Sequence, residues 1–233
     1  MSILAWVQED FLVQDVSSFR AVLFDFDGTL GDSYPAITAS VNYVRSLYGM
    51  PPLEEAEVRR HVGRGAPYLL EHTVPAGSIE ANTAAYRAHH PSVLRSGTRL
   101  MPGAAEALRT LHERGLRLGV CSNKPVGFTK ELLAYFKVDS CVDVVLGPED
   151  VARPKPAPDM LREALSRLRL TAAEALYVGD MTVDIQTARA AGATVWVVPT
   201  GSDELQTLRQ ARPDRILQNL DELRRLFIGE GTA

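Results

Sequence analysis

Two hydrophobic patterns alternate along the second half of the chain, from about residue 102 onward. Short apolar runs bounded by polar or glycine residues predict strands at 116–121, 141–146, 175–178, 194–198 and 215–217. Apolar residues at helical spacing predict helices at 102–115, 126–138, 158–170, 182–191 and 219–227, and another from residue 203. Strands joined by helical crossovers lie parallel, so the pattern predicts a parallel sheet covered by helices on both faces.

Residues 34–98 follow a different pattern, in which helical spacing is not interrupted by strand-like runs. Helices are predicted at 36–48, 53–61, 66–73 and 79–90, separated by prolines and glycines. This segment lies between an apolar run at 21–24 and the other strands. We therefore predict an α/β protein with a doubly wound parallel sheet, formed by residues 19–33 and 99–233, and an inserted α-helical cap domain at 34–98.

Composition narrows the classes of function. The 233 residues, 45% of them hydrophobic and 23% charged, are typical of a globular protein with a sizeable core. A net charge of −4 argues against nucleic acid as a partner, and no apolar run is long enough to cross a membrane. Residues 1–18 lack the basic start and apolar core of a secretory signal. They are interpreted as an N-terminal extension, either packed or frayed.

The two cysteines, Cys121 and Cys141, both lie in apolar runs. Two cysteines cannot form a disulfide framework, so we expect buried free thiols and a cytoplasmic location. Oligomeric state is left open between monomer and homodimer.

The apolar run at 21–24 ends abruptly at two aspartates, Asp25 and Asp27, followed by Gly28 and Thr29. Side chains two residues apart in a strand point the same way, and the carboxyl end of a buried strand is where α/β sheets carry their chemistry. Two carboxylates this close repel each other unless a cation or a proton lies between them. Oxygen ligands of this kind suit Mg²⁺.

Two further strand ends carry polar residues that suit phosphate. Ser122 and Asn123 follow the predicted strand 116–121, and a hydroxyl beside exposed amides can cradle phosphoryl oxygens. Asp180 follows strand 175–178, and Asp184 lies about one turn into the next helix. In addition, Lys155 stands between two prolines, which stiffen the backbone that presents its ammonium group.

Taken in order, these segments resemble the four motifs of the haloacid dehalogenase (HAD) superfamily. The matches are Asp-x-Asp-Gly-Thr at 25–29, the serine at 122, Lys-Pro-x-Pro-Asp at 155–159 and Gly-Asp-x-x-x-Asp at 179–184. Each segment alone is also compatible with an ordinary turn, loop or helix cap. All four in order favour the family, and the resemblance covers about residues 20–200.

The resemblance implies a Rossmann-like core and phosphoryl transfer through an aspartyl-phosphate. Asp25 would be the nucleophile, and Asp27 would act first as general acid and then as base. Ser122 and Lys155 would neutralise and orient phosphoryl oxygens. The implied substrate-binding residues of the core are Thr29, Ser122, Asn123 and Lys155. Thr29 is expected to hydrogen-bond locally and so shape the turn at Asp27.

The resemblance also implies Mg²⁺ as cofactor. Its ligands would be Asp25, Asp180 and Asp27, the last through its backbone carbonyl. Asp184 belongs to the same predicted metal site, where it would position either Lys155 or a metal-bound water.

Substrate choice is expected to come from the cap. Arg64 lies between two glycines just before the predicted helix 66–73 and could clamp a carboxylate, although a solvated arginine is the plain alternative. The segment is similar to a loop of phosphoglycolate phosphatases, so the best single substrate is 2-phosphoglycolate, a small phosphorylated metabolite. The histidines are scattered and are interpreted as surface or packing residues: His61, His72, His89, His90 and His112.

Several alternatives stay open at this point. One is a phosphomutase similar to β-phosphoglucomutase, and others are a pyrophosphatase or a broad sugar-phosphate phosphatase. A dehalogenase and a non-catalytic binding protein are disfavoured, because every required acid is present. A phosphonoacetaldehyde hydrolase would need a Schiff-base lysine in the cap, and no lysine occurs between Thr29 and Lys124.

Overall fold

A computed structural model describes residues 16–229 of the chain. The predicted N-terminal extension therefore lies outside the described residues, apart from a 3-10 turn at Val16–Ser18. The core is a six-stranded sheet in the order β5-β4-β1-β6-β7-β8. All neighbouring strands pair in parallel, which confirms the predicted α/β class.

The strands of this sheet are short. They comprise β1 (Ala21–Phe24), β4 (Arg117–Cys121), β5 (Val144–Leu146), β6 (Ala175–Gly179), β7 (Thr194–Val197) and β8 (Arg215–Ile216). One prediction was too long: the run at 141–146 becomes a strand only at Val144, because Cys141 ends a 3-10 turn at Asp139–Cys141. Both cysteines are nevertheless free and buried.

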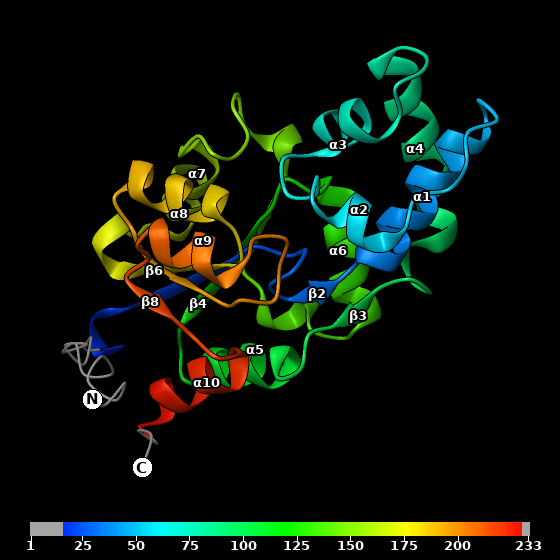
Figure 1. The fold of residues 1–233 in the computed structure, drawn as a ribbon. Helices are drawn as coiled ribbons and strands as arrows, with labels where there is room; N and C mark the ends of the chain where they lie inside the picture. The colour runs from blue at the N-terminus through cyan, green and yellow to red at the C-terminus, as the bar shows by residue number, and fades with distance from the viewer. Residues whose placement is uncertain (1–15, 230–233) are drawn as a thin grey trace, which may run out of the picture.

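Helices cover both faces of the sheet (Figure 1). They are α5 (Ala104–Glu113), α6 (Val126–Tyr135), α7 (Asp159–Leu168), α8 (Thr182–Ala191), α9 (Leu205–Gln210) and α10 (Leu220–Ile228). Successive side chains of β1 point to opposite faces of the sheet and so belong to two separate hydrophobic clusters. Val22 and Phe24 belong to the cluster containing residues of α5 and α10, whereas Ala21 and Leu23 pack with residues of α7 and α8. This two-sided burial explains why β1 is continuously apolar.

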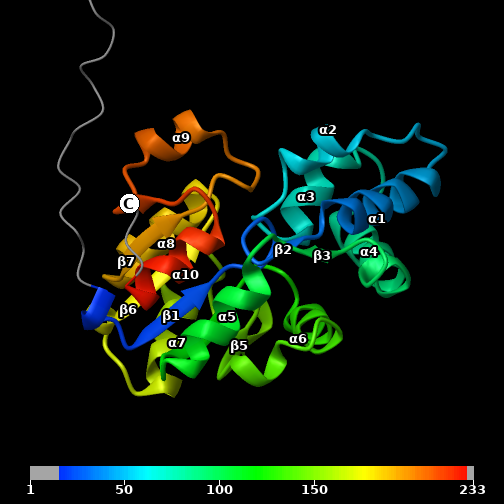
Figure 2. The same cartoon turned by 90° about the horizontal axis from the view of Figure 1, so that it is seen from below.

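Four helices form the inserted cap, which lies to one side of the sheet (Figure 2). They are α1 (Tyr34–Ser46), α2 (Glu55–Arg59), α3 (Ala66–Thr73) and α4 (Ile79–Leu94). The cap has its own hydrophobic cluster, which includes Val41, Val44 and Leu70. Helix α4 continues past Pro91, where the sequence prediction ended it. Leu94 explains the continuation, since it is fully buried in the core cluster and anchors the end of α4 to the sheet domain.

A two-stranded antiparallel sheet joins cap and core. Strand β2 (Gly31–Asp32) leads into the cap, and β3 (Arg99–Leu100) leads out of it. Strands of two residues have no detectable period, so the sequence pattern did not predict them. No helix within residues 16–229 is long and apolar enough to cross a membrane.

Candidate active site

Three adjacent strands bring the predicted motifs to one edge of the sheet. Asp25, Ser122 and Asp180 each follow directly after a strand, respectively β1, β4 and β6. Strand β1 lies between β4 and β6, because the chain builds one half of the sheet and then crosses to the other side. Open α/β sheets bind ligands at such a switch in strand order. Lys155 reaches the same place from the loop between β5 and α7.

Asp25 is buried beside Lys155, and the Oδ1 of Asp25 lies 2.9 Å from the Nζ of Lys155. Burial raises the pKa of Asp25 to about 6; Lys155 opposes the rise, and the nearby Asp184 adds to it. A carboxylate in such a poorly solvated position needs adjacent positive charge to remain ionised, as a nucleophile must. The ion pair with Lys155 provides that charge.

Lys155 is held by two further groups. Its Nζ lies 2.7 Å from Oδ1 of Asp184 and donates to the hydroxyl of Tyr177 at 3.0 Å. Burial alone would lower the pKa of Lys155, but the charges of Asp184 and Asp25 raise it well above its usual value. The other oxygen of Asp184 accepts the backbone N–H groups of Asp180 and Met181. Asp184 therefore contacts Lys155, which is one of the two groups that the sequence analysis expected it to position.

The sequence interpretation missed Tyr177. Its hydroxyl donates to the backbone carbonyl of Cys121 at 2.9 Å and lies 3.1 Å from Oδ1 of Asp184. The only available signal was a tyrosine within an otherwise aliphatic, buried strand. Buried tyrosine hydroxyls require polar partners, and here the partners belong to the site.

Carboxylate oxygens of Asp25, Asp180 and Asp184 lie within 4.8 Å of one another. Burial, together with the charges of Asp184 and Asp25, raises the pKa of Asp180 well above its usual value. Its Oδ2 has no hydrogen-bond partner among residues 16–229. An orphaned oxygen among three crowded carboxylates fits a divalent cation, which would neutralise their repulsion and accept oxygen ligands.

Two glycines leave room around Asp180. A side chain at Gly28, whose φ is +89°, would place its Cβ 2.4 Å from Oδ2 of Asp180, and one at Gly201 would place it 1.5 Å from the same atom. Thr29 contributes here as well, because its hydroxyl donates to Oδ1 of Asp180 at 2.6 Å. The local bond expected for Thr29 at the Asp27 turn is made by its backbone N–H, which donates to the carbonyl of Phe26 at 3.2 Å, and not by its hydroxyl. A hydroxyl can reach a neighbouring strand end as easily as its own turn.

Asp27 lies apart from the three-carboxylate cluster. Its carboxylate pairs with Lys124, whose Nζ lies 3.1 Å from Oδ1 and 3.3 Å from Oδ2. Lys124 is buried, and sequence reasoning noted it without assigning it a role. The two aspartates of the first motif thus have separate lysine partners, and these positive charges offset the repulsion expected from the spacing of the two carboxylates.

The charges of the site do not balance by themselves. Four carboxylates face two ammonium groups, so the fully ionised site has an excess of two negative charges. One divalent cation would offset that excess before an anionic substrate binds.

Asn123 connects the cap, the core and Lys155. Its side-chain nitrogen donates to the backbone carbonyls of Gly63 and Lys155, each at 3.0 Å, and its oxygen accepts the N–H of Lys155 at 3.0 Å. These contacts occupy the amide fully, although Asn123 also lines the cavity. Ser122 lines the cavity next to it, and its hydroxyl accepts the N–H of Lys124 at 3.3 Å.

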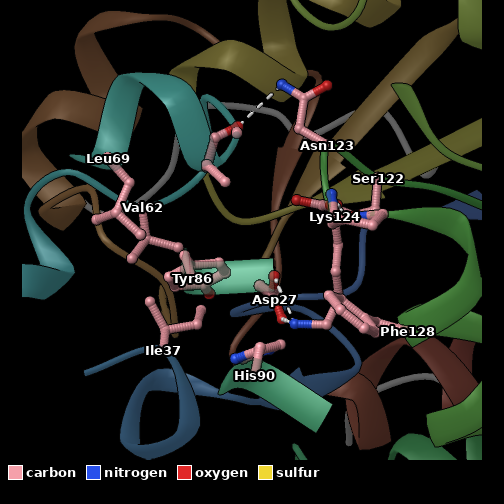
Figure 3. Close-up of a pocket in the computed structure, with 15 residues that line it drawn as sticks. Asp27, Ile37, Val62, Leu69, Tyr86, His90, Ser122, Asn123, Lys124 and Phe128 are labelled. Atoms are coloured by element: carbon pink, nitrogen blue, oxygen red, sulfur yellow. Dashed lines mark hydrogen bonds and ion pairs between the residues drawn. The ribbon is translucent and has the colours of Figure 1, made fainter. Parts of the chain in front are cut away.

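A cavity lies between the strand ends and the cap (Figure 3). One side carries Asp25, Asp27, Ser122, Asn123 and Lys124. The cap side is mostly apolar and includes Ile37, Val62, Ala66, Leu69 and Tyr86, together with His90. Phe128 also lines the cavity but belongs to α6 of the core. Arg64 does not line the cavity. It is exposed, with its guanidinium 5.1 Å from the centre of the Tyr68 ring, so this structure does not place it to bind a group in the cavity.

Fold and site together define an α/β enzyme with buried carboxylates and lysines at the strand ends and a helical cap above them. A family model described as haloacid dehalogenase-like hydrolase matches residues 22–198. The chain belongs to this family. The phosphoglycolate phosphatase of Rhodospirillum rubrum is 37% identical over 193 residues, covering 78% of this chain and 80% of that protein.

Two other relatives agree. The phosphoglycolate phosphatase of Salmonella typhi is 31% identical over 232 residues, covering 89% of this chain and 92% of that protein. The crystal structure of a predicted phosphoglycolate phosphatase from Haemophilus somnus superimposes with a TM-score of 0.85 at 25% identity, covering 90% of this chain and 98% of that one.

Proposed function

We propose that this protein is a Mg²⁺-dependent phosphatase that hydrolyses 2-phosphoglycolate through an aspartyl-phosphate, in the cytoplasm. The observation that carries the chemistry is the position of Asp25, which lines the cavity at the end of β1 and is paired with Lys155. The similarity to phosphoglycolate phosphatases over 78–89% of this chain supports the substrate. The free, buried cysteines are consistent with a reducing compartment.

In the first step a carboxylate oxygen of Asp25 attacks phosphorus, and the bond from phosphorus to the ester oxygen breaks. Asp27 enters this step protonated, having taken a proton from water in the preceding turnover, and gives that proton to the departing alkoxide. In the second step Asp27 takes a proton from water, whose oxygen attacks the same phosphorus. The bond from phosphorus to Asp25 then breaks and releases inorganic phosphate. Lys124, paired with Asp27, positions that carboxylate for both transfers.

The residues that would hold Mg²⁺ are Asp25, Asp180 and the backbone carbonyl of Asp27, with Asp184 oriented beside them. When bound, the ion would polarise the phosphoryl oxygens and reduce their repulsion of the incoming carboxylate. Ser122 and Lys155 lie beside Asp25, where they would contact the remaining phosphoryl oxygens.

The test is phosphate release from 2-phosphoglycolate, pyrophosphate, hexose phosphates and nucleotides, measured with Mg²⁺ and with EDTA. We expect Mg²⁺-dependent release with the highest kcat/KM for 2-phosphoglycolate. A preference for pyrophosphate or for many sugar phosphates would retain the core chemistry and refute the substrate. Conversion of one hexose phosphate isomer into another, with a persistent phosphoenzyme, would show a phosphomutase instead.

A further inference from the structure

We propose that His90 is a substrate-binding residue, whose uncharged Nε2–H donates a hydrogen bond to the carboxylate of the substrate. The inference rests on the proposed function, because it names the group that recognises the non-phosphoryl end of 2-phosphoglycolate. It also changes the sequence interpretation, in which His90 was a packing or surface residue and Arg64 was the candidate clamp.

His90 lies deep in the wall of the cavity. It is 1% exposed, its ring stacks on Tyr86 at a centroid distance of 4.9 Å, and the ring of Phe128 lies 5.0 Å away. The Nδ1 atom faces α1, where it lies 2.8 Å from the hydroxyl oxygen of Ser40. The Nε2 atom has no hydrogen-bond partner in the described part of the chain. A buried ring nitrogen without a partner is costly, so it points to a ligand.

The surroundings of His90 keep it neutral. Burial lowers its pKa to about 3, and the facing charge of Lys124 and the adjacent His89 act in the same direction. At neutral pH the ring therefore carries one proton, on one of its two nitrogens. A neutral N–H donor beside the lysine can bind a carboxylate without adding a second buried positive charge.

Ser40 decides which nitrogen carries the proton. Its hydroxyl has three groups within reach: the carbonyl of Ala36 at 3.1 Å, Nδ1 of His90 at 2.8 Å and Nδ1 of His89 at 3.3 Å. When the hydroxyl donates to Nδ1 of His90, the ring proton lies on Nε2 and faces the cavity. Ser40 is thus a positioning residue, because it sets the tautomer and does not line the cavity itself.

Elimination among the cavity residues supports the assignment. The core side of the cavity supplies Ser122 and the paired acids and lysines for the phosphoryl group, and the amide of Asn123 is fully occupied. On the cap side, the lining side chains are hydrocarbon apart from the hydroxyl of Tyr86 and the ring of His90. His90 is the lining residue there that offers an unpartnered nitrogen, next to Lys124. A carboxylate two bonds from the ester oxygen would reach the edge of the phosphoryl site, where these two residues meet.

The experiment compares kcat and KM for 2-phosphoglycolate and for ethyl phosphate, which has a leaving group of the same length without the carboxylate. For His90→Phe we expect kcat/KM for 2-phosphoglycolate to fall about 10- to 100-fold, the loss typical of a hydrogen bond to a charged group, mainly through KM. The value for ethyl phosphate should change less than about 2-fold. His90→Gln, whose amide nitrogen can replace Nε2–H, should recover most of the loss.

His112→Phe is the control, since His112 is exposed on α5 and does not line the cavity, whereas the adjacent His89 lies 3.3 Å from the hydroxyl of Ser40 and would disturb it. It should leave the ratio of the two kcat/KM values unchanged, whereas Ser40→Ala should lower it. Equal losses on both substrates in His90→Phe would show a structural role and overturn the inference. If the wild-type protein ignores 2-phosphoglycolate, the proposed function fails instead, so the two failures are distinguishable.

Nitrogen NMR provides a readout that survives poor folding of a variant. Asp25→Asn protein, labelled with ¹⁵N-histidine and loaded with Mg²⁺, would be titrated with 2-phosphoglycolate. We expect the His90 Nε2 signal to lie in the range of a protonated nitrogen in the bound protein, and to stay there from pH 6 to 8. A signal that stays unprotonated, or that titrates near pH 6.5 as an imidazolium, would overturn the inference.

Discussion

The two ends of the cavity are built in opposite ways. At the sheet end, three buried carboxylates, the half-buried carboxylate of Asp27 and two buried lysines lie together, and each lysine pairs with at least one acid. At the cap end, mostly hydrocarbon side chains surround the neutral imidazole of His90 and the hydroxyl of Tyr86. The difference shows that the sheet end concentrates charge to act on a phosphoryl group, whereas the cap end selects by shape and by very few polar contacts.

The two ends also differ in how they are held. Strand ladders and two hydrophobic clusters fix the residues of the sheet end. The cap, in contrast, meets the core through contacts that can separate. Arg59 donates to the backbone carbonyls of Thr200 and Gly201 at 2.7–3.2 Å, and Asn123 donates to that of Gly63. Such contacts, with β2 and β3 as the connection, suit a cap that opens for exchange of substrate and product.

The largest expected effect is at the sheet end. Asp25→Asn keeps the size of the side chain but removes the attacking charge, so kcat should fall by at least about 10³-fold. The measurement is steady-state phosphate release with Mg²⁺, with circular dichroism to confirm folding. Turnover close to the wild-type rate would exclude the covalent route. It would also contradict the conclusion that the sheet end of the cavity carries the chemistry.

Lys124→Met should lower kcat by about 10²- to 10³-fold, within the range typical of disturbed acid–base catalysis. The thioether chain preserves much of the packing but leaves Asp27 without its buried partner. Lys130→Met, on the same segment of the chain but outside the cavity, is the control and should have no such effect. A similar loss in both variants would contradict a specific role for Lys124.

Asp180→Asn should separate activity from stability. We expect it to abolish most Mg²⁺-dependent turnover, yet to raise the Tm of the metal-free protein at pH 7 by a few degrees, because it removes one of three repelling carboxylates. Adding Mg²⁺ should raise the Tm of the wild type more than that of the variant. Thermal melts with EDTA and with Mg²⁺ check this, and a lower Tm for the metal-free variant would count against carboxylate repulsion.

The same crowding predicts how stability depends on pH. Burial raises the pKa of Asp25 from 3.8 to about 6, so between these values the folded protein binds more protons at this group than the unfolded chain does. The contribution of Asp25 to stability is therefore largest below pH 4 and decreases as the pH rises to about 6. Urea unfolding without metal, compared between wild type and Asp25→Asn, should show a smaller decrease in the variant, in which Asp180 still has a raised pKa.

The smallest expected effects are at the cap. Arg64→Ala should change kcat/KM for 2-phosphoglycolate by less than about 2-fold, since Arg64 is exposed over Tyr68. Arg59→Ala, which removes the contacts with the carbonyls of Thr200 and Gly201, should raise KM several-fold by weakening closure of the cap. Kinetics of both variants side by side measure this, and a large loss in Arg64→Ala would restore the arginine clamp.

Local patterns predicted most of the fold. The buried strands and the amphipathic helices have periods that are visible within ten residues, and the fold class followed from their alternation. The mispredicted ends have identifiable causes: residues 141–146 form a largely apolar run although Cys141 still belongs to a 3-10 turn, and α4 passes Pro91 because Leu94 packs into the core. Strands β2 and β3 were not predicted because each is only two residues long and their pairing joins segments on either side of the whole cap.

The sequence by itself determined which residues stand at the strand ends, since an apolar strand that stops at a polar residue places that residue at the edge of the sheet. Only the tertiary structure decided the partners. Lys124 meets Asp27 across 97 positions, Thr29 meets Asp180 across 151, and His90 meets Ser40 across 50. No local period encodes such contacts, because they depend on how separate elements pack. For the same reason the structure, rather than the sequence pattern, placed His90 in the cavity and Arg64 outside it.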